Sequence, residues 1–232
     1  FWLYLIAVLP EYRKVKKLEK EGRIAEHDER VRRAVGRWAN SLLRLAGAKI
    51  TTEGKENIPQ GPVVFVGNHQ GYFDIPLMIT QLDKPNPLIA KKEIQKIPMI
   101  RSWMEQLRCI FLDREDPRQS MDSLKQAQEL LKQGYSVVIF PEGTRNNGKE
   151  LGEFKAGAIR IATRTGVPIV PVCIEGSCRL MGKGSLWIHP AKVTIKILPA
   201  VQTEGLSREQ IKALPEQLRE QIDTQLRTMR NE

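Results

Sequence analysis

The chain has 232 residues and carries 37 lysines and arginines against 27 aspartates and glutamates, a formal net charge of +10. This length is sufficient for one sizeable α/β domain with an appendage. The positive charge predicts an anionic partner: a phosphate substrate, a membrane surface or a nucleic acid. The three cysteines form no CxxC pair, and no set of Cys and His residues has metal-ligand spacing. We therefore predict no structural zinc and no metal centre, and interpret the cysteines as small buried hydrophobic residues.

The first nine residues are almost wholly apolar, and the chain begins with Phe1 rather than methionine. Such a segment is too short to span a bilayer, which needs about 20 residues. We interpret it as the end of a longer hydrophobic anchor or as an interfacial segment rich in Trp and Tyr. A signal-peptide remnant is the alternative. The strongly basic residues 13–17 that follow favour the cytoplasmic flank of a membrane segment.

Residues 11–48 are predicted to be helical, because apolar residues recur at intervals of three and four and form one face. These residues are Val31, Val35, Trp38, Leu42 and Leu45. A basic amphipathic helix with Trp on its apolar face is typical of membrane-surface binding. The alternative is that this face packs on the domain core and leaves the arginines in water. The apolar N-terminus favours the membrane interpretation. We therefore expect residues 1–48 to anchor the chain and residues 49–232 to form an α/β domain with a C-terminal helical tail.

Beyond residue 50, strand-like and helix-like segments alternate along the chain. The strand-like runs are residues 63–67, 88–90, 109–112, 136–140, 167–174 and 193–198. The clearest helix begins near Ser120 and ends at Gly134, a residue type common just after a helix. This alternation predicts an α/β fold with a mixed, largely parallel central sheet flanked by helices. In such folds, ligands bind at the carboxyl ends of the strands.

The tail over residues 207–229 has a second amphipathic pattern. Ser207 and Gln210 have the spacing of a capping box, which predicts a helix start. Pro215 is predicted to break the helix in two, because proline has no backbone N–H to donate. We assign this tail to packing.

A histidine and an aspartate, His69 and Asp74, follow the buried strand at residues 63–67. Such a pair can take a proton from a hydroxyl, with the imidazole as base and the carboxylate orienting it. Residues five apart on a straight helix would lie about 140° apart. We therefore expect His69 in a turn that Gly71 makes easy, and Asp74 in or near the first turn of a helix. The alternative is a structural histidine that closes a loop; His27 and His189, which have no acidic partner at this spacing, are assigned to structure.

A second polar segment, Glu142-Gly143-Thr144-Arg145, follows the strand at residues 136–140. Its glycine permits close approach of a ligand, and its arginine is suited to phosphate. Alone, such a segment is an ordinary turn. Lys91 and Arg114, however, close two further strands. The convergence of these strand ends predicts an active site for a phosphorylated substrate.

The order of these blocks resembles that of the glycerolipid acyltransferases, the HxxxxD family, over roughly residues 50–200. The matching blocks are HxxxxD at 69–74, a strand ending in arginine at 114, FPEGTR at 140–145 and VPIVP at 167–171. Within the family, the likeness is closest to bacterial enzymes that acylate 1-acylglycerol 3-phosphate. One departure is present: where relatives often have glycine at the start of the second block, this chain has Leu107-Arg108-Cys109.

The resemblance implies a role for each of the matching residues. His69 would be the general base for the sn-2 hydroxyl of the acceptor, and Asp74 would orient it and stabilise its charge, with no covalent acyl-enzyme. The residues implied to hold the substrate phosphate are Lys91, Arg114 and Arg145. The residues implied to shape the glycerol-phosphate site are Glu142, Gly143 and Thr144. The family needs no cofactor, because the acyl-CoA or acyl carrier protein thioester is a co-substrate.

The function implied is the transfer of an acyl chain from acyl-CoA or acyl carrier protein to 1-acylglycerol 3-phosphate, which gives phosphatidate. We expect this to occur at the cytoplasmic face of the cell membrane, with anionic lipid as a partner. Another lysophospholipid or glycerol 3-phosphate is the alternative acceptor. Two other classes are a non-catalytic binder of anionic lipid and a nucleic-acid binder. We expect no nucleic-acid partner, because the basic residues are interleaved with acids and form no recognised binding motif.

Overall fold

The computed structural model describes residues 9–82, 84, 87–113 and 116–231. A five-stranded sheet has the order β1-β7-β6-β2-β5. Its strands are β1 (Lys49–Glu53), β2 (Val64–Gly67), β5 (Val137–Ile139), β6 (Ile169–Glu175) and β7 (Lys192–Ile197). Strand β7 is antiparallel to β6, and the other neighbouring strands are parallel. The mixed, mostly parallel sheet expected from the alternating sequence pattern is therefore confirmed.

Two further strands extend the sheet beyond β5. Strands β3 (Ile89–Lys91) and β4 (Ile110–Leu112) pair in parallel, and a parallel bridge from Leu88 to Val138 connects them to β5. The carboxyl ends of β2, β3, β5 and β6 consequently lie at one edge of the sheet. All six predicted strand segments form strands. Strand β1 was not predicted, because its sequence KITTE has a single apolar residue, Ile50, and none of its residues is fully buried.

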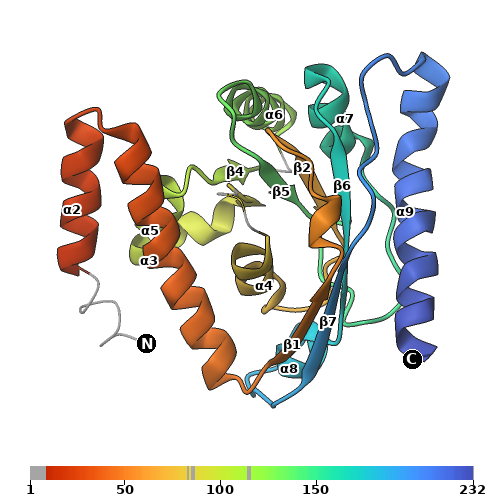
Figure 1. Cartoon of the computed structure of the whole chain (residues 1–232), viewed down its shortest axis with the longest axis horizontal. Helices are drawn as coiled ribbons and strands as arrows, with labels where there is room; N and C mark the ends of the chain where they lie inside the picture. The colour runs from red at the N-terminus through yellow and green to blue at the C-terminus, as the bar shows by residue number, and fades with distance from the viewer. Residues whose placement is uncertain (1–8, 83, 85–86, 114–115, 232) are drawn as a thin grey trace.

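Helices cover both faces of the sheet, which explains why β2 and β6 are buried along their whole length (Figure 1). One face packs against α6 (Pro117–Lys132), α7 (Ala156–Thr165) and α9 (Arg208–Asn231). The other face packs against α3 (Ile24–Leu45) and α4 (Asp74–Gln81). Along β2, Phe65 joins the α3–α4 side while Val64 and Val66 join the other, as the alternation of a strand requires.

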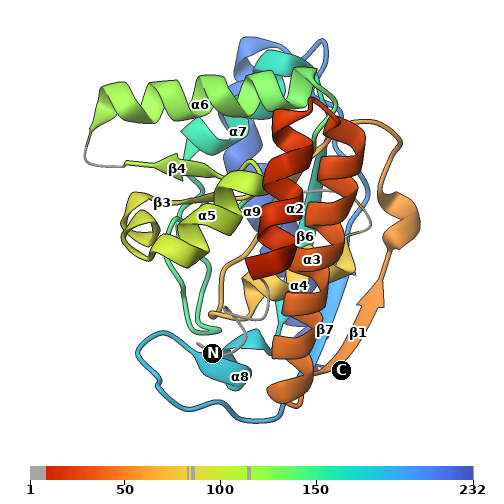
Figure 2. The ribbon, with the colours of Figure 1, turned by 90° about the vertical axis from the view of Figure 1, so that its left-hand side faces the viewer.

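The remaining helices are α2 (Leu9–Lys20), α5 (Pro98–Gln106) and α8 (Ser177–Met181), with 3₁₀ turns η1 (Lys55–Asn57) and η2 (Lys92–Lys96). Helix α2 lies beside α3, and Figure 2 shows the pair at the front of the domain. The predicted helix from Ser120 is α6, which Asp116 caps by accepting from the backbone N–H groups of Arg118 and Gln119.

The apolar face of α3 requires a correction to the membrane interpretation. Val31 and Val35 are buried together with Val15 of α2, and Trp103 packs against this cluster. Apart from Leu45, which is 86% exposed, the face therefore packs inward against α4 and α5, which was the alternative interpretation. Within the part of the chain that the structure describes, no helix is both long and apolar enough to cross a membrane. The apolar residues 1–8 lie outside the described residues.

The predicted break at Pro215 is wrong, because α9 continues through it as one helix. Its apolar stripe is buried against the sheet on both sides of the proline. The stripe consists of Leu214, Leu218, Ile222 and Leu226. This packing holds the helix together across the missing N–H. The predicted capping box is confirmed: Ser207 N donates to Gln210 Oε1 over 2.7 Å, and Gln210 N donates to Ser207 Oγ over 3.3 Å.

Candidate active site

His69 and Asp74 are brought together by the turn between β2 and α4. Nδ1 of His69 lies 2.6 Å from Oδ2 of Asp74. The Asp74 side chain is fully buried, whereas 18% of the His69 side chain is exposed. Because the carboxylate accepts, Nδ1 carries the hydrogen in a neutral ring, which leaves a lone pair on Nε2. A partly exposed imidazole held in this way can act as a base.

The Asp74 carboxylate is fixed by donors on both of its oxygens. Oδ2 accepts from the backbone N–H of Gln70 over 2.7 Å and from that of Gly71 over 2.9 Å. Oδ1 accepts from the hydroxyl of Ser177, at the start of α8. These donors stabilise a buried negative charge and hold it in one orientation toward His69. The turn at Gly71 thus folds the aspartate back onto the histidine, as the spacing required.

The loop after β5 supports His69 from a second side. The His69 ring stacks on Phe140, with ring centroids 4.3 Å apart. Its backbone N–H donates to Oε1 of Glu142 over 2.8 Å, and its carbonyl accepts from the N–H of Asn146 over 2.8 Å. The ends of β2 and β5 are therefore joined at the histidine itself.

Glu142 serves mainly as the acceptor that joins these loops. It is buried, and besides His69 its carboxylate accepts from Nδ2 of Asn146 over 2.9 Å and from the N–H of Gly152 over 3.0 Å. These protein donors occupy both oxygens. The residue thus acts on the geometry of the loop and not by presenting a free carboxylate to a polyol.

Gly143, Thr144 and Arg145 follow Glu142 in this loop: Gly143 is buried, Thr144 is exposed and Arg145 is half-buried. Gly143 has a φ of 72°, a conformation that glycine adopts without strain. The Arg145 guanidinium lies over the ring of Tyr72, 3.7 Å from its centroid, so Arg145 reaches the loop that carries His69. The Thr144 side chain is exposed and lies 3.4 Å from Nζ of Lys183. The sequence had not indicated Tyr72 or Lys183.

The other two predicted phosphate ligands are less closely placed. Lys91 is the last residue of β3, at the same sheet edge as the ends of β2 and β5, and its side chain is exposed. Arg114 lies outside the described residues. Lys92, which follows Lys91 in the chain, forms an ion pair with Asp113, the residue just after β4.

The carboxyl end of β6 contributes residues that no sequence motif indicated. Nε2 of Gln70 donates to Oε2 of Glu175 over 2.9 Å, and Oε1 of Gln70 accepts from the N–H of Gly176 over 3.0 Å. Glu175 also binds Arg230 from the end of α9 over 3.1 Å. Ser177 lies 103 positions after the aspartate that it contacts. Local pattern carries no signal of such pairs.

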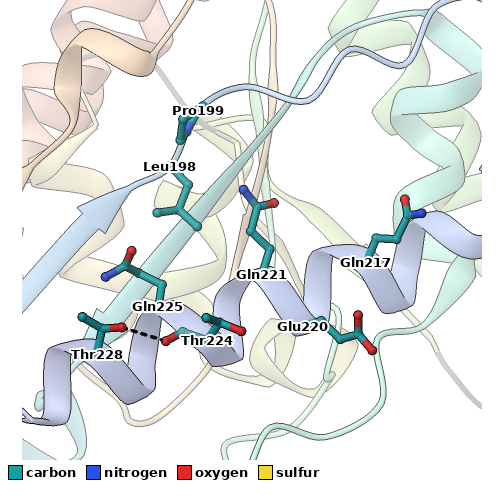
Figure 3. Close-up of a pocket in the computed structure, with 8 residues that line it drawn as sticks. All are labelled: Leu198, Pro199, Gln217, Glu220, Gln221, Thr224, Gln225 and Thr228. Carbon is teal, nitrogen blue, oxygen red and sulfur yellow. Dashed lines mark hydrogen bonds between the residues drawn. The ribbon is translucent and has the colours of Figure 1, made fainter.

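A hollow of about 490 Å³ elsewhere in the structure is not part of this site (Figure 3). It lies along α9 next to Leu198 and Pro199 and is lined mostly by glutamine and threonine side chains. None of its lining residues is a histidine that could act as a base, or a lysine or arginine that could bind a phosphate.

Comparison with known proteins agrees with the motifs. A family model described as "Acyltransferase" matches residues 49–175. A chloroplastic 1-acyl-sn-glycerol-3-phosphate acyltransferase of Arabidopsis thaliana is 44% identical over 139 residues, which are 59% of this chain and 39% of that protein. A 1-acyl-sn-glycerol-3-phosphate acyltransferase of Borreliella burgdorferi is 32% identical over 189 residues, which are 81% of this chain and 76% of that protein.

A solved structure matches over almost the whole length. The crystal structure of PlsC, the 1-acyl-sn-glycerophosphate acyltransferase from Thermotoga maritima, superposes with a TM-score of 0.79 at 26% identity, covering 99% of this chain and 98% of that one. The chain spans only 39% and 40% of the length of the two chloroplastic relatives. The family model nevertheless matches more than half of the residues. The chain belongs to the acyltransferase family.

Proposed function

We propose that this protein transfers an acyl chain from acyl-CoA or acyl carrier protein to the sn-2 hydroxyl of 1-acylglycerol 3-phosphate, with phosphatidate as product. The observation that carries the proposal is the contact of His69 Nδ1 with Asp74 over 2.6 Å, which leaves Nε2 as a base on a partly exposed ring. Relatives named for this acceptor support the choice of substrate.

In the proposed reaction, Nε2 of His69 removes the proton of the sn-2 hydroxyl while the hydroxyl oxygen attacks the carbonyl carbon of the thioester. The C–S bond of the tetrahedral intermediate then breaks, and the thiolate takes the proton from the imidazolium. Asp74 stabilises the imidazolium between these steps. The acyl group passes directly to the acceptor oxygen, so no acyl-enzyme forms.

The phosphate of the acceptor is proposed to bind beside His69. Arg145 offers a planar set of donors suited to phosphate, and Tyr72 positions it. Thr144 adds a hydroxyl, and Gly143 lets the backbone approach the ligand. Lys91 is proposed as a further cation because it closes β3 at this edge of the sheet. Arg114 is proposed from the sequence alone, because it follows the apolar run at residues 109–112. Glu142 shapes the site by joining its loops.

Membrane association at the cytoplasmic face is part of the proposal, because the acceptor is a bilayer lipid. The net charge of +10 is the supporting observation, since it favours anionic lipid and the polyanionic donor. The apolar start of the sequence is proposed as an anchor.

A thioester-release assay with a panel of acceptors tests the proposed function. We expect release to depend on 1-acylglycerol 3-phosphate and to fall by about 10³-fold or more in His69→Ala, because the base is lost. Arg160→Ala is the control, since it removes an exposed side chain of α7 and keeps the pair. Faster release with glycerol 3-phosphate or another lysophospholipid would show that this compound, and not 1-acylglycerol 3-phosphate, is the acceptor. Lipid binding without any release would indicate a non-catalytic binder.

A further inference from the structure

The loop between α8 and β7 exposes three consecutive large apolar side chains. Leu186, Trp187 and Ile188 are 88%, 76% and 51% exposed. Short hydrogen bonds order the loop around them: Ser185 Oγ accepts from the N–H of Trp187 over 3.1 Å, and Ser185 N donates to the carbonyl of Gly182 over 3.1 Å. A contiguous apolar surface on an ordered loop indicates an interaction site. We call residues 183–189 the apolar loop.

A fourth exposed residue lies at the same end of the molecule. Leu45, the last residue of α3, is 86% exposed. The turn that follows it contacts the two residues just after the apolar loop. A Cβ added at Gly47 would lie 2.9 Å from Cβ of Pro190, and Lys49 N donates to the carbonyl of Ala191 over 2.9 Å. Figures 1 and 2 both show the lower end of α3 beside this loop.

The charged residues of the two chain segments that carry these apolar side chains are all basic. Their exposed basic side chains are Arg44, Lys49, Arg179, Lys183 and Lys192. Residues 41–52 and 176–192 contain no aspartate or glutamate. Aromatic and aliphatic side chains surrounded by lysine and arginine suit the interface of a bilayer that carries anionic headgroups. The absence of acidic residues from both segments favours an anionic bilayer over a protein partner, because a protein surface would usually accept some acidic residues here.

The apolar loop is also joined to the site that contains His69. Gly182, just before it, pairs with Gly71 in an antiparallel bridge. The carbonyl of Lys183 accepts from Nδ2 of Asn147 over 3.3 Å, in the loop that supports His69. A membrane that received this loop would therefore lie next to the entrance of the site.

We propose that the apolar loop and Leu45 insert into the interface of an anionic bilayer and hold the mouth of the site against it. The residues of this contact are other than those of the apolar N-terminal sequence. It shares with the proposed function only the premise that the ligand is a lipid. A lysophospholipid could then keep its acyl chain in the bilayer while its headgroup reaches Arg145 and His69.

Quenching of tryptophan fluorescence by brominated phospholipids tests the insertion directly and needs no activity. The vesicles contain phosphatidylcholine and phosphatidylglycerol with brominated acyl chains, and the protein is the full chain. We expect strong quenching in the wild type and at least twofold weaker quenching in Trp187→Phe, because the inserted tryptophan is lost. The loss is not expected to be complete, because three other tryptophans remain. Equal quenching of the two proteins when both are bound to vesicles would overturn the proposal.

Vesicle sedimentation gives a second measurement. Replacing both Leu186 and Ile188 by glutamine should weaken binding about tenfold or more, since two apolar side chains leave the interface. The matched control is Met121→Gln, an exposed apolar residue on α6 at the far end of the molecule. Unchanged binding of the double variant, or dimerisation through the loop that protects Trp187 from the bromine, would refute insertion. Absence of acyl transfer would refute the proposed function alone, because neither measurement depends on it.

Discussion

Ser177 donates its hydroxyl hydrogen to Oδ1 of Asp74, while His69 contacts Oδ2 of the same carboxylate. The two oxygens of the aspartate thus bind different parts of the structure: Oδ2 contacts the proposed base, and Oδ1 accepts from the first residue of α8. Because the serine does not touch the proposed reacting atoms, it is a positioning residue.

Ser177→Ala should lower kcat by about tenfold and leave KM for the acceptor nearly unchanged, because a hydrogen bond to a charged group is lost from the orientation of Asp74. Steady-state kinetics with a short-chain acceptor measure this. Thr163→Ala is the control, since that hydroxyl donates to the carbonyl of Arg160 within α7. A change in KM with normal kcat would show that Ser177 acts on substrate binding instead.

Glu142→Gln should destabilise the protein and reduce activity, although the two side chains have the same shape. The amide nitrogen would have to face one of the backbone or side-chain donors that the carboxylate now accepts from. The loss of such a buried charged acceptor costs about 2–3 kcal/mol. Chemical denaturation measures it, with exposed Glu150→Gln as the control. Full activity and stability in Glu142→Gln would contradict the joining role.

Arg145→Lys should raise KM for the acceptor by about tenfold, even though the charge is kept. Lysine lacks the planar donor set and the stacking on Tyr72, both of which fix the cation beside the site. Tyr72→Phe keeps a ring for stacking and is expected to bind normally, whereas Tyr72→Ala should resemble Arg145→Lys. Measurement of KM over a range of acceptor concentrations separates these variants, and an unchanged KM in Arg145→Lys would exclude Arg145 as a phosphate ligand.

Asp28 gives a pH-dependent contribution to stability. Burial opposes its ionisation, but hydrogen bonds from Tyr135 and His27 and the charge of Arg108 together hold the pKa of Asp28 below its ordinary value. Since the folded pKa lies below the unfolded one, about 3.9, the stabilisation is complete above that pH and is lost as the pH falls through the folded pKa.

Asp28→Asn should therefore be less stable than the wild type by about 2 kcal/mol near neutral pH, with a smaller difference near pH 3. Urea denaturation at both values measures this. The control is Asp122→Asn, an exposed residue of α6 that pairs only with a neighbouring lysine in the same helix. A difference that is the same at both pH values would show that packing, and not the charge, stabilises this cluster.

The sequence predicted what depends on local pattern. The strands that end before His69 and Glu142 are apolar runs bounded by turn residues, and they form where expected. Strand β1 was missed because its side chains alternate at the edge of the sheet, where little burial is needed. Pro215 was misjudged because the tertiary packing of α9 exceeds the loss of one hydrogen bond.

The candidate site was predicted only in part, because only some of its contacts depend on local sequence pattern. His69 and Asp74 lie close along the chain, so a turn suffices to join them. Ser177 and Glu175 reach the site from the end of β6, which only the folded sheet brings near. What covers the apolar face of α3 was likewise not determined by the sequence, because an amphipathic pattern does not specify whether protein or lipid packs against it.

The links between distant segments also bear on how the protein loses and regains its activity. Gln70 reaches Glu175 across 105 positions, and Arg230 reaches the same carboxylate from near the end of α9. Contacts of such long sequence separation form late and are slow to find. A chain that has formed only its first helices would lack the contacts that Ser177 makes to Asp74 and that Glu142 makes to His69. Enzymatic activity should therefore disappear in the same cooperative step as the sheet on denaturation, and during refolding it should return only after α9 has docked.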